Sequence, residues 1–182
     1  MPRSIRSIRI VQEPLSGSAD LVNLYFRAYQ PLGDYYYRHR AEVKAYLKWL
    51  RHRDPHGSFV AYDGDRPVGF IATDSRWDHG TVGAIHELVV DPEYQGRGLG
   101  RALLLRGMAY LRARGCRVCE LWVGEHNDRA RALYRALRFQ ENGRWGKWIQ
   151  MTRSLEDLPE GIDLEATLAG SPPSIPGSPE DR

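Results

Sequence analysis

The chain has 182 residues, of which 42% are hydrophobic and 27% are charged. These proportions are those of an ordinary soluble globular protein, and the length suits one domain with a sizeable core. The net charge of +3 does not indicate nucleic-acid binding, because a basic footprint also needs clustering. No apolar run approaches the roughly 20 residues of a membrane helix, and the first residues lack a signal-peptide core. We therefore expect a cytoplasmic protein with no membrane or nucleic-acid partner.

The first residues of the chain predict one strand followed by two helices. Residues 7–12 alternate apolar and polar side chains, as an edge strand does. Apolar side chains then recur at helical spacing over 16–29 and again over about 36–51. Pro31 and Gly33 break the pattern between the two segments, so we expect two separate helices.

Three β runs follow the second helix, at 58–62, 67–73 and 81–90. The first two flank Asp63-Gly64-Asp65, which is a strong signal for a two-strand turn. Short turns between successive strands indicate antiparallel pairing, so this section predicts a meander.

The next helix is expected to reach about Arg114 and to end at Gly115. The strand that follows, at 117–123, should lie parallel to 81–90, because a helix separates the two. Neighbouring parallel strands can leave a crevice at their C-terminal ends, where ligands bind in open sheets. The remaining predicted elements are a helix and two closing strands, at 126–137, around 139 and at 145–152.

After Leu155, proline and glycine interrupt the sequence and the apolar periodicity fades. We expect a short turn of helix over 162–168 and disorder from about Ala169 onward. The chain therefore predicts one folded domain over 1–155. It is followed by a largely disordered extension over 156–182 that is rich in Pro, Gly and Ser.

Cys116 and Cys119 form a CxxC pair, a spacing that occurs in redox and metal sites. The pair lies in a run typical of a strand, where residues three apart point to opposite faces. The sequence has no second Cys pair and no matching His cluster. We therefore expect two buried or half-buried free thiols and no metal.

The run Gln95-Gly96-Arg97-Gly98-Leu99-Gly100 places three glycines at alternate positions between a strand and a helix. Glycine lets the backbone approach a ligand closely, and the first turn of a helix directs unpaired N–H groups at one point. Such a turn suits a phosphate or pyrophosphate, although a purely structural turn has the same pattern. Arg101 rules out a GxGxxG dinucleotide motif that starts at Gly96, and the helix entry lacks the Gly-Lys-Ser/Thr of a Walker loop.

Gln95, Gly98 and Gly100 match the pattern Q/R-x-x-G-x-G/A, and the region thereby resembles the acyl-CoA pyrophosphate loop of the GCN5-related N-acetyltransferase (GNAT) family. A second match runs from Asn127 to Phe139. It fits the family's N-x-x-A-x-x-L-Y-x-x-L-G-F helix, except that Arg138 replaces the usual glycine, which puts the helix exit in doubt.

The resemblance covers roughly residues 5–154 and implies the GNAT fold. That fold is an α/β arrangement of the α+β mixed type. Its central, mostly antiparallel sheet splays between the fourth and fifth strands and is flanked by four helices. The resemblance also implies acetyl-CoA as co-substrate, no metal, and direct attack of an amine on the thioester in a ternary complex.

The resemblance implies cofactor-binding roles for three groups of positions in this chain. Backbone amides of Leu88, Val89 and Val90 would hold pantetheine like an added strand. Asn127 would bond the pantetheine arm, and Ala130 is small where a thin ligand crosses the helix. The pyrophosphate would lie on the loop formed by Gln95, Gly96, Arg97, Gly98, Leu99, Gly100 and Arg101. The two arginines can pair with CoA phosphates or remain solvated charges.

Acetyl transfer to an amine needs a group that removes the amine proton. Glu87 is the best candidate, because it is an acid in the apolar strand beside the predicted crevice, where burial would raise its pKa toward neutrality. Strand alternation puts His86 on the opposite face, so only one of the two can point at the acceptor, and water is a third candidate. The resemblance makes Tyr134 the general acid for the leaving thiolate, whereas the pattern alone also fits a core aromatic residue.

The resemblance places the acceptor between the loop joining the first two helices and the final hairpin. The candidates there are Tyr35, Tyr36 and Trp145, whose rings could instead belong to the core. Aromatic walls with Arg38 and Arg40 suit a compact amine with an apolar part or a carboxylate, so we expect a small-molecule or peptide amine. Family members often pair through their last strands, which allows a homodimer. The alternative function is a non-catalytic acyl-CoA-binding sensor or interaction module.

Overall fold

The computed structural model describes residues 8–33 and 35–158, and these form one seven-stranded sheet. The strands are β1 (Ile8–Gln12), β2 (Ser58–Asp63), β3 (Arg66–Asp78), β4 (Val82–Val90), β5 (Val118–Gly124), β6 (Gln140–Trp145) and β7 (Trp148–Ser154). Their order is β1-β2-β3-β4-β5-β7-β6, with antiparallel pairing everywhere except between β4 and β5. The predicted meander and the predicted parallel pair are both confirmed.

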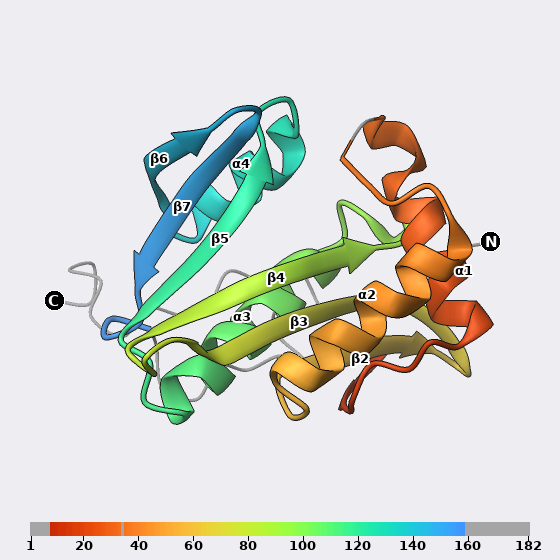
Figure 1. The fold of residues 1–182 in the computed structure, drawn as a ribbon, viewed down its shortest axis with the longest axis horizontal. Helices are drawn as coiled ribbons and strands as arrows, with labels where there is room; N and C mark the ends of the chain where they lie inside the picture. Colours follow the sequence, from red (N-terminus) through yellow and green to blue (C-terminus); the bar gives the residue numbers. More distant parts are fainter. Residues whose placement is uncertain (1–7, 34, 159–182) are drawn as a thin grey trace, which may run out of the picture.

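Within the described ranges, four α-helices cover the two faces of the sheet (Figure 1). They are α1 (Ala19–Tyr29), α2 (Arg40–Arg53), α3 (Leu99–Ala113) and α4 (Asp128–Ala136), with 3-10 turns η2 (Gln30–Leu32) and η3 (Pro92–Tyr94) after α1 and β4. One buried cluster joins α1 and α2 to β2, β3 and β4. A larger cluster joins α3 and the end of α4 to the opposite face. This arrangement confirms the expected fold class.

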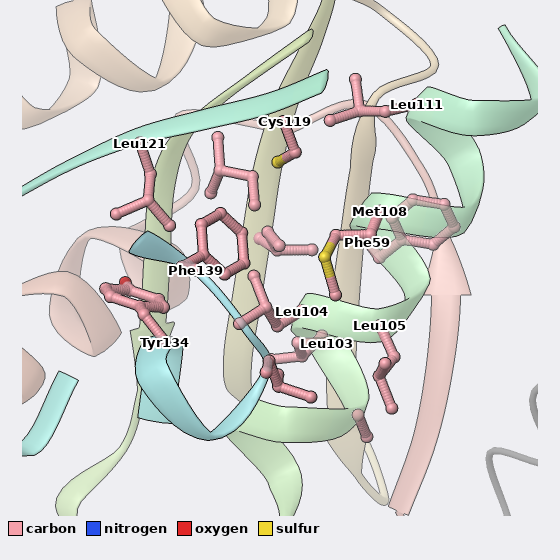
Figure 2. Close-up of a cluster of buried hydrophobic side chains, with 14 of the residues drawn as sticks. Phe59, Leu103, Leu104, Leu105, Met108, Leu111, Cys119, Leu121, Tyr134 and Phe139 are labelled. Carbon is pink, nitrogen blue, oxygen red and sulfur yellow. The ribbon is translucent and has the colours of Figure 1, made fainter. Parts of the chain in front are cut away.

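The larger cluster fixes α3, and with it the glycine-rich turn, against the sheet. Figure 2 shows part of this cluster, in which Leu103, Leu104 and Met108 of α3 are fully buried. Tyr134 and Phe139 close the cluster on the side of α4, with their ring centroids 5.8 Å apart. Burial of such side chains is the main favourable term in folding, so the turn before α3 rests on a rigid support.

The described chain ends in contact with the core. Leu155 and Leu158, which follow β7, are buried in the larger cluster. The helical turn predicted over 162–168 and the disorder predicted from Ala169 lie outside the described residues, as does residue 7 of the first predicted strand.

The parallel strands β4 and β5 pair only along their first parts. The ladder joins Val82–Ile85 to Val118–Leu121. Beyond that point β5 stays paired with β7 as far as Gly124, whereas β4 stays paired with β3 as far as Val90. The two strands therefore diverge at their C-terminal ends, as Figure 1 shows. This divergence is the predicted splay.

The second helix begins at Arg40, so the predicted start near residue 36 is wrong. His39 and Glu42 form a capping box, in which the backbone N–H of His39 donates to Glu42 Oε2 at 3.1 Å. Tyr36 and Tyr37 therefore lie in the segment that joins α1 to α2. The helix begins at this cap, although the aromatic residues before it also follow helical spacing.

Cys116 and Cys119 are buried free thiols, as predicted. The prediction that they point to opposite faces is wrong, because both side chains belong to the larger cluster. Cys116 precedes β5, which begins at Val118, so strand alternation does not apply to it. Burial raises the pKa of both thiols, which opposes formation of the reactive thiolate.

Candidate active site

A cavity of about 1060 Å³ opens where β4 and β5 diverge. Its walls come from α1, α2, the ends of β4 and β5, the start of α3, α4 and the β6–β7 hairpin. The structure brings fifteen of the predicted site residues together in this lining, namely Tyr35, Tyr36, Glu87, Leu88, Val89, Val90, Gln95, Gly96, Gly98, Gly100, Arg101, Asn127, Ala130, Tyr134 and Trp145.

The other two predicted residues of the glycine loop point elsewhere. The guanidinium of Arg97 lies 5.8 Å from the centroid of the Tyr94 ring. The side chain of Leu99 is 1% exposed and packs in the larger cluster. Neither residue belongs to the cavity lining.

The glycine-rich turn has the backbone shape that its sequence suggested. Gly96 and Gly98 have φ angles of +75° and +88°, which residues with a Cβ rarely adopt. Gly98 is the N-cap of α3, and among the described residues no side chain caps this end. The first N–H groups of α3 are therefore available to an anion, at the positive end of the helix dipole.

The same turn leaves little room for side chains on its cavity side. A Cβ on Gly96 would lie 3.3 Å from the guanidinium of Arg129, and one on Gly100 would lie 3.3 Å from Leu133. Arg129 and Arg101 both line the cavity near this turn. Bare backbone with two nearby cations fits a pyrophosphate group.

Helix α4 forms the wall opposite β4. The side chain of Asn127 caps this helix, because its Oδ1 accepts a hydrogen bond from the N–H of Ala130 at 3.3 Å. Ala130 and Tyr134 follow on the cavity side of the helix. Tyr134 is 7% exposed, so it combines a core position with a place in the cavity lining.

Glu87 is a buried acid that is held by tyrosines of both neighbouring helices. The hydroxyl of Tyr29 in α1 donates to its carboxylate. The hydroxyl of Tyr46 in α2 donates to the backbone carbonyl oxygen of His86 at 3.3 Å, and its interaction with the carboxylate lowers the pKa of Glu87. Burial raises the pKa of Glu87 to about 7, although the bonds from the two tyrosines lower it in part.

Tyr134 faces the same cavity as Glu87. Burial raises the pKa of Tyr134 well above its ordinary value, and the negative charge of Glu87 raises it further. The phenol is therefore protonated at neutral pH. A reaction that both removes and delivers a proton needs one group that accepts a proton and one that donates a proton. A buried carboxyl group with a pKa of about 7 and a protonated phenol at the same cavity can supply the two.

A β-bulge in β4 contradicts the prediction that His86 and Glu87 face opposite sides of the sheet. The ladder with β3 pairs Ala72 with Glu87 and Thr73 with Ile85, which leaves His86 as an extra residue. The alternation of side chains is broken at that point. Both His86 and Glu87 line the cavity.

The imidazole of His86 is engaged by groups of α2 and β3. Its Nε2 lies 3.2 Å from the fully buried carboxylate of Asp74, which also binds the guanidinium of Arg53 at 2.7 Å. The rings of Trp49 and Trp77 each lie 5.0 Å from the imidazole. Burial lowers the pKa of His86, although Asp74 opposes this effect, so the ring is neutral at pH 7.

Aromatic rings dominate the part of the cavity that lies away from the glycine-rich turn. Tyr35 approaches Trp148 edge to face at 5.3 Å, and Tyr36 stacks with Tyr29 at 6.2 Å. Trp145 is 76% exposed at the tip of the β6–β7 hairpin, yet it reaches the lining. Arg40, which was expected beside these rings, instead donates to Asn23 at 2.8 Å.

The sequence did not single out Tyr29, Tyr46, Arg129 or Lys147 as site residues, although all four line the cavity. Tyr46 lies at an apolar position of the helical pattern over 36–51, so helical spacing alone accounts for it. Tyr29 lies one helical turn after Tyr25, which is a spacing that indicates a shared helix face. What marks Tyr29 as a site residue is its hydrogen bond to Glu87, and the sequence does not show a bond between residues 58 positions apart.

The described residues contain neither a metal-binding cluster nor a membrane-spanning helix. No group of three or more His, Cys, Asp or Glu side chains there is arranged to hold a metal ion. No helix in this part of the chain is long and apolar enough to cross a membrane.

The model of the acetyltransferase (GNAT) family matches residues 19–139, which is more than half of the chain. The chain belongs to the GNAT acetyltransferase family. It is 39% identical over 140 residues to an uncharacterised N-acetyltransferase of Methanocaldococcus jannaschii, a match that covers 75% of this chain. This GNAT chain spans 62% of the length of that relative.

Solved structures show the same relationship in three dimensions. A crystal structure from Pyrococcus horikoshii OT3 matches this GNAT chain with a TM-score of 0.71 and 35% identity, over 81% of this chain and 98% of that chain. A putative acetyltransferase of Salmonella typhimurium, solved with its cofactor acetyl-CoA, matches with a TM-score of 0.66 and 20% identity, over 83% and 95% of the two chains. The second match shows a shared fold.

Proposed function

We propose that this protein is an acetyl-CoA-dependent N-acetyltransferase that acetylates a primary amine of a small molecule or peptide. The observation that carries the proposal is the presence of Glu87 and Tyr134 at one cavity with the glycine-rich turn. The proposed reaction is a direct attack of the amine on the thioester in a ternary complex. This route needs no nucleophile from the enzyme, and the two cysteines are buried thiols with raised pKa values.

Glu87 is the proposed general base. With a pKa of about 7, a large fraction of its carboxyl group is ionised at neutral pH, and it can take a proton from an arriving ammonium group. Tyr29 holds the carboxylate in place, and both Tyr29 and Tyr46 stabilise its charged form. Burial within the aromatic wall raises the pKa of the carboxyl group, so its ionised form is a stronger base than an exposed glutamate.

The splay of the sheet supplies the groups that orient the thioester. Beyond Ile85, the backbone of β4 leaves its β5 partner, and Leu88, Val89 and Val90 line the cavity wall. Backbone donors that are fixed in place stabilise negative charge on a carbonyl oxygen without reorganisation. Tyr134, which stays protonated, is the proposed proton donor at the position of the leaving thiolate.

Acetyl-CoA would supply the activated acetyl group. Its pyrophosphate would accept hydrogen bonds from the backbone between Gly96 and Arg101, with the cations of Arg101 and Arg129 nearby. Asn127 and Ala130 would border its thin pantetheine arm at the start of α4. The open backbone at the turn, the uncapped start of α3 and the small Ala130 support this fit.

Release of CoA in the presence of a panel of primary amines and short peptides tests the proposal. We expect at least one acceptor to release free CoA thiol and to gain an acetyl group that mass spectrometry detects in equal amount. A reaction without amine serves as the control for hydrolysis. Tight binding of acetyl-CoA in calorimetry, with no turnover across the panel, would instead support an acyl-CoA sensor.

A further inference from the structure

Consecutive tyrosines in the segment between α1 and α2 are anchored on different sides of the cavity. Tyr36 packs towards α1, with its ring 6.2 Å from Tyr29 and 6.4 Å from Phe26. Tyr35 packs towards the β6–β7 hairpin, with its ring 5.3 Å from Trp148 and the Nζ of Lys147 4.9 Å from its centroid. The segment therefore crosses the opening between β4 and β5 and is held on both sides.

The ring of Tyr35 also rests on Gly124, the last residue of β5. A Cβ placed on Gly124 would lie only 2.6, 2.7 and 2.9 Å from three ring carbons of Tyr35. Contacts under about 3 Å do not occur between real Cβ atoms and their neighbours, so any side chain at this position would displace the ring. Gly124 is not among the glycines with positive φ, so packing space, not backbone conformation, accounts for glycine here.

We propose that Gly124 and Tyr35 form a clasp that closes the acceptor end of the cavity and selects amines on narrow, unbranched arms. The clasp rests on the proposed function, because it assumes that the acceptor amine reaches Glu87 through this end. Tyr35, Gly124, Lys147 and Trp148 all line the cavity. The Tyr35 ring fills space at the C-terminal end of β5, where the splay would otherwise be widest.

A branch on the carbon next to the amine would compete with the Tyr35 ring for that space. A linear arm would pass beside the ring and keep the contacts with Gly124, Lys147 and Trp148 intact. In a pocket with fixed walls, two substrates that differ by one methylene group differ in kcat/KM by a factor of about 10 to 200. The clasp therefore predicts discrimination between isomers of one amine.

A double-mutant cycle of Tyr35→Ala and Gly124→Ala tests the clasp through acceptor selectivity. The readout is the ratio of kcat/KM for n-butylamine to that for sec-butylamine. We expect each single substitution to lower this ratio about tenfold, and Gly124→Ala to have no further effect in the Tyr35→Ala background, because its new methyl group would then meet no ring. The Kd for acetyl-CoA should stay within about twofold of the wild-type value.

The matched control is Gly17→Ala, because a Cβ there would meet only Lys44 at an ordinary distance of 3.7 Å, outside the cavity. This control should leave the ratio unchanged. Two results would overturn the clasp: an unchanged ratio in both single variants, or an equal effect of Gly124→Ala with and without the Tyr35 ring.

Thermal unfolding gives a readout that does not depend on turnover. Gly124→Ala should lower the unfolding midpoint by a few degrees in the wild-type background and leave it unchanged in the Tyr35→Ala background. If no amine is acetylated, the proposed function fails, while this second cycle still decides whether the contact exists. An equal loss of stability in both backgrounds would show that Tyr35 does not rest on Gly124.

Discussion

The hydroxyl of Tyr29 donates a hydrogen bond to the carboxylate of Glu87, and this bond joins α1 to the buried acid of β4. The hydroxyl of Tyr46 of α2, which donates to the carbonyl oxygen of His86 at 3.3 Å, also interacts with this carboxylate. Burial raises the pKa of Glu87, and interactions with the two tyrosine hydroxyls and with the backbone N–H of Leu88 limit that rise to about 7. The carboxyl group therefore titrates near neutral pH, which suits the general base that we propose, because a base works best when its pKa lies near the working pH.

Replacement of Tyr29 by Phe removes one of these donors and leaves the ring in place. Because the lost bond favours the charged carboxylate, the pKa of Glu87 should rise, and the acid limb of the pH profile of kcat/KM should move up by about one pH unit. Activity at pH 7 should fall, and most of it should return at higher pH. Tyr62→Phe is the matched control, because Tyr62 donates to Glu13 and lies outside the cavity lining. An acid limb at the same pH in Tyr29→Phe and wild type would contradict the role of this bond.

The ionisation of Glu87 should also be visible in protein stability. Its pKa is about 7 in the folded protein and ordinarily 4.5, so between these values the folded state holds a proton that the unfolded chain has released. Stability should therefore fall as pH rises through this window, by about 3 kcal/mol in total. Urea unfolding should show that Glu87→Gln gains about that much relative to wild type between pH 4 and pH 8. A difference between the two proteins that does not change with pH would show that Glu87 titrates normally.

Tyr134→Phe tests the proposed proton donor. Removal of the hydroxyl should lower kcat about 100-fold, since general acids contribute on that scale, and the Kd for acetyl-CoA should change little. Tyr110→Phe controls for loss of a tyrosine hydroxyl elsewhere, because Tyr110 donates to Asp54 and not to a group in the cavity lining. An unchanged kcat would leave Tyr134 with a packing role only.

Arg138 offers a test of backbone strain at the exit of α4. Its φ is +67°, a conformation that costs a residue with a Cβ about 1 kcal/mol, and its guanidinium lies 3.0 Å from Asp157. Arg138→Gly and Arg138→Ala both lose the ion pair, but only the glycine variant loses the strain. In urea denaturation the glycine variant should therefore be more stable than the alanine variant by about 1 kcal/mol. The opposite order, which is usual at unstrained positions, would contradict the strained exit.

The features that the sequence predicted well are those encoded by local patterns. The three glycines before α3 lie within one short segment, and so does the run from Asn127 to Phe139. Turn residues and helical spacing can therefore be recognised there from the sequence alone. The parallel pair and its splay followed from the order of strand, helix and strand. The departure at Arg138 was also visible as a mismatch, and the structure gives it a positive φ.

The features that the sequence could not give depend on contacts between distant segments. The bulge that brings His86 to the side of Glu87 arises from the register between β3 and β4, where one residue is skipped. The bond between Tyr29 and Glu87 links residues 58 positions apart. The contact between Tyr35 and Gly124 likewise depends on how the sheet opens. Periodicity carries no information about such pairs.

The pH dependence of kcat/KM for wild type and Glu87→Gln, with one amine that the panel identifies, tests the central claim most directly. Both proteins share any limb due to the amine itself, so the comparison isolates Glu87. We predict that wild type loses activity below about pH 7, and that Glu87→Gln is about 100-fold less active and lacks this limb. A Glu87→Gln variant with the wild-type limb and wild-type activity would contradict the assignment of Glu87 as the base.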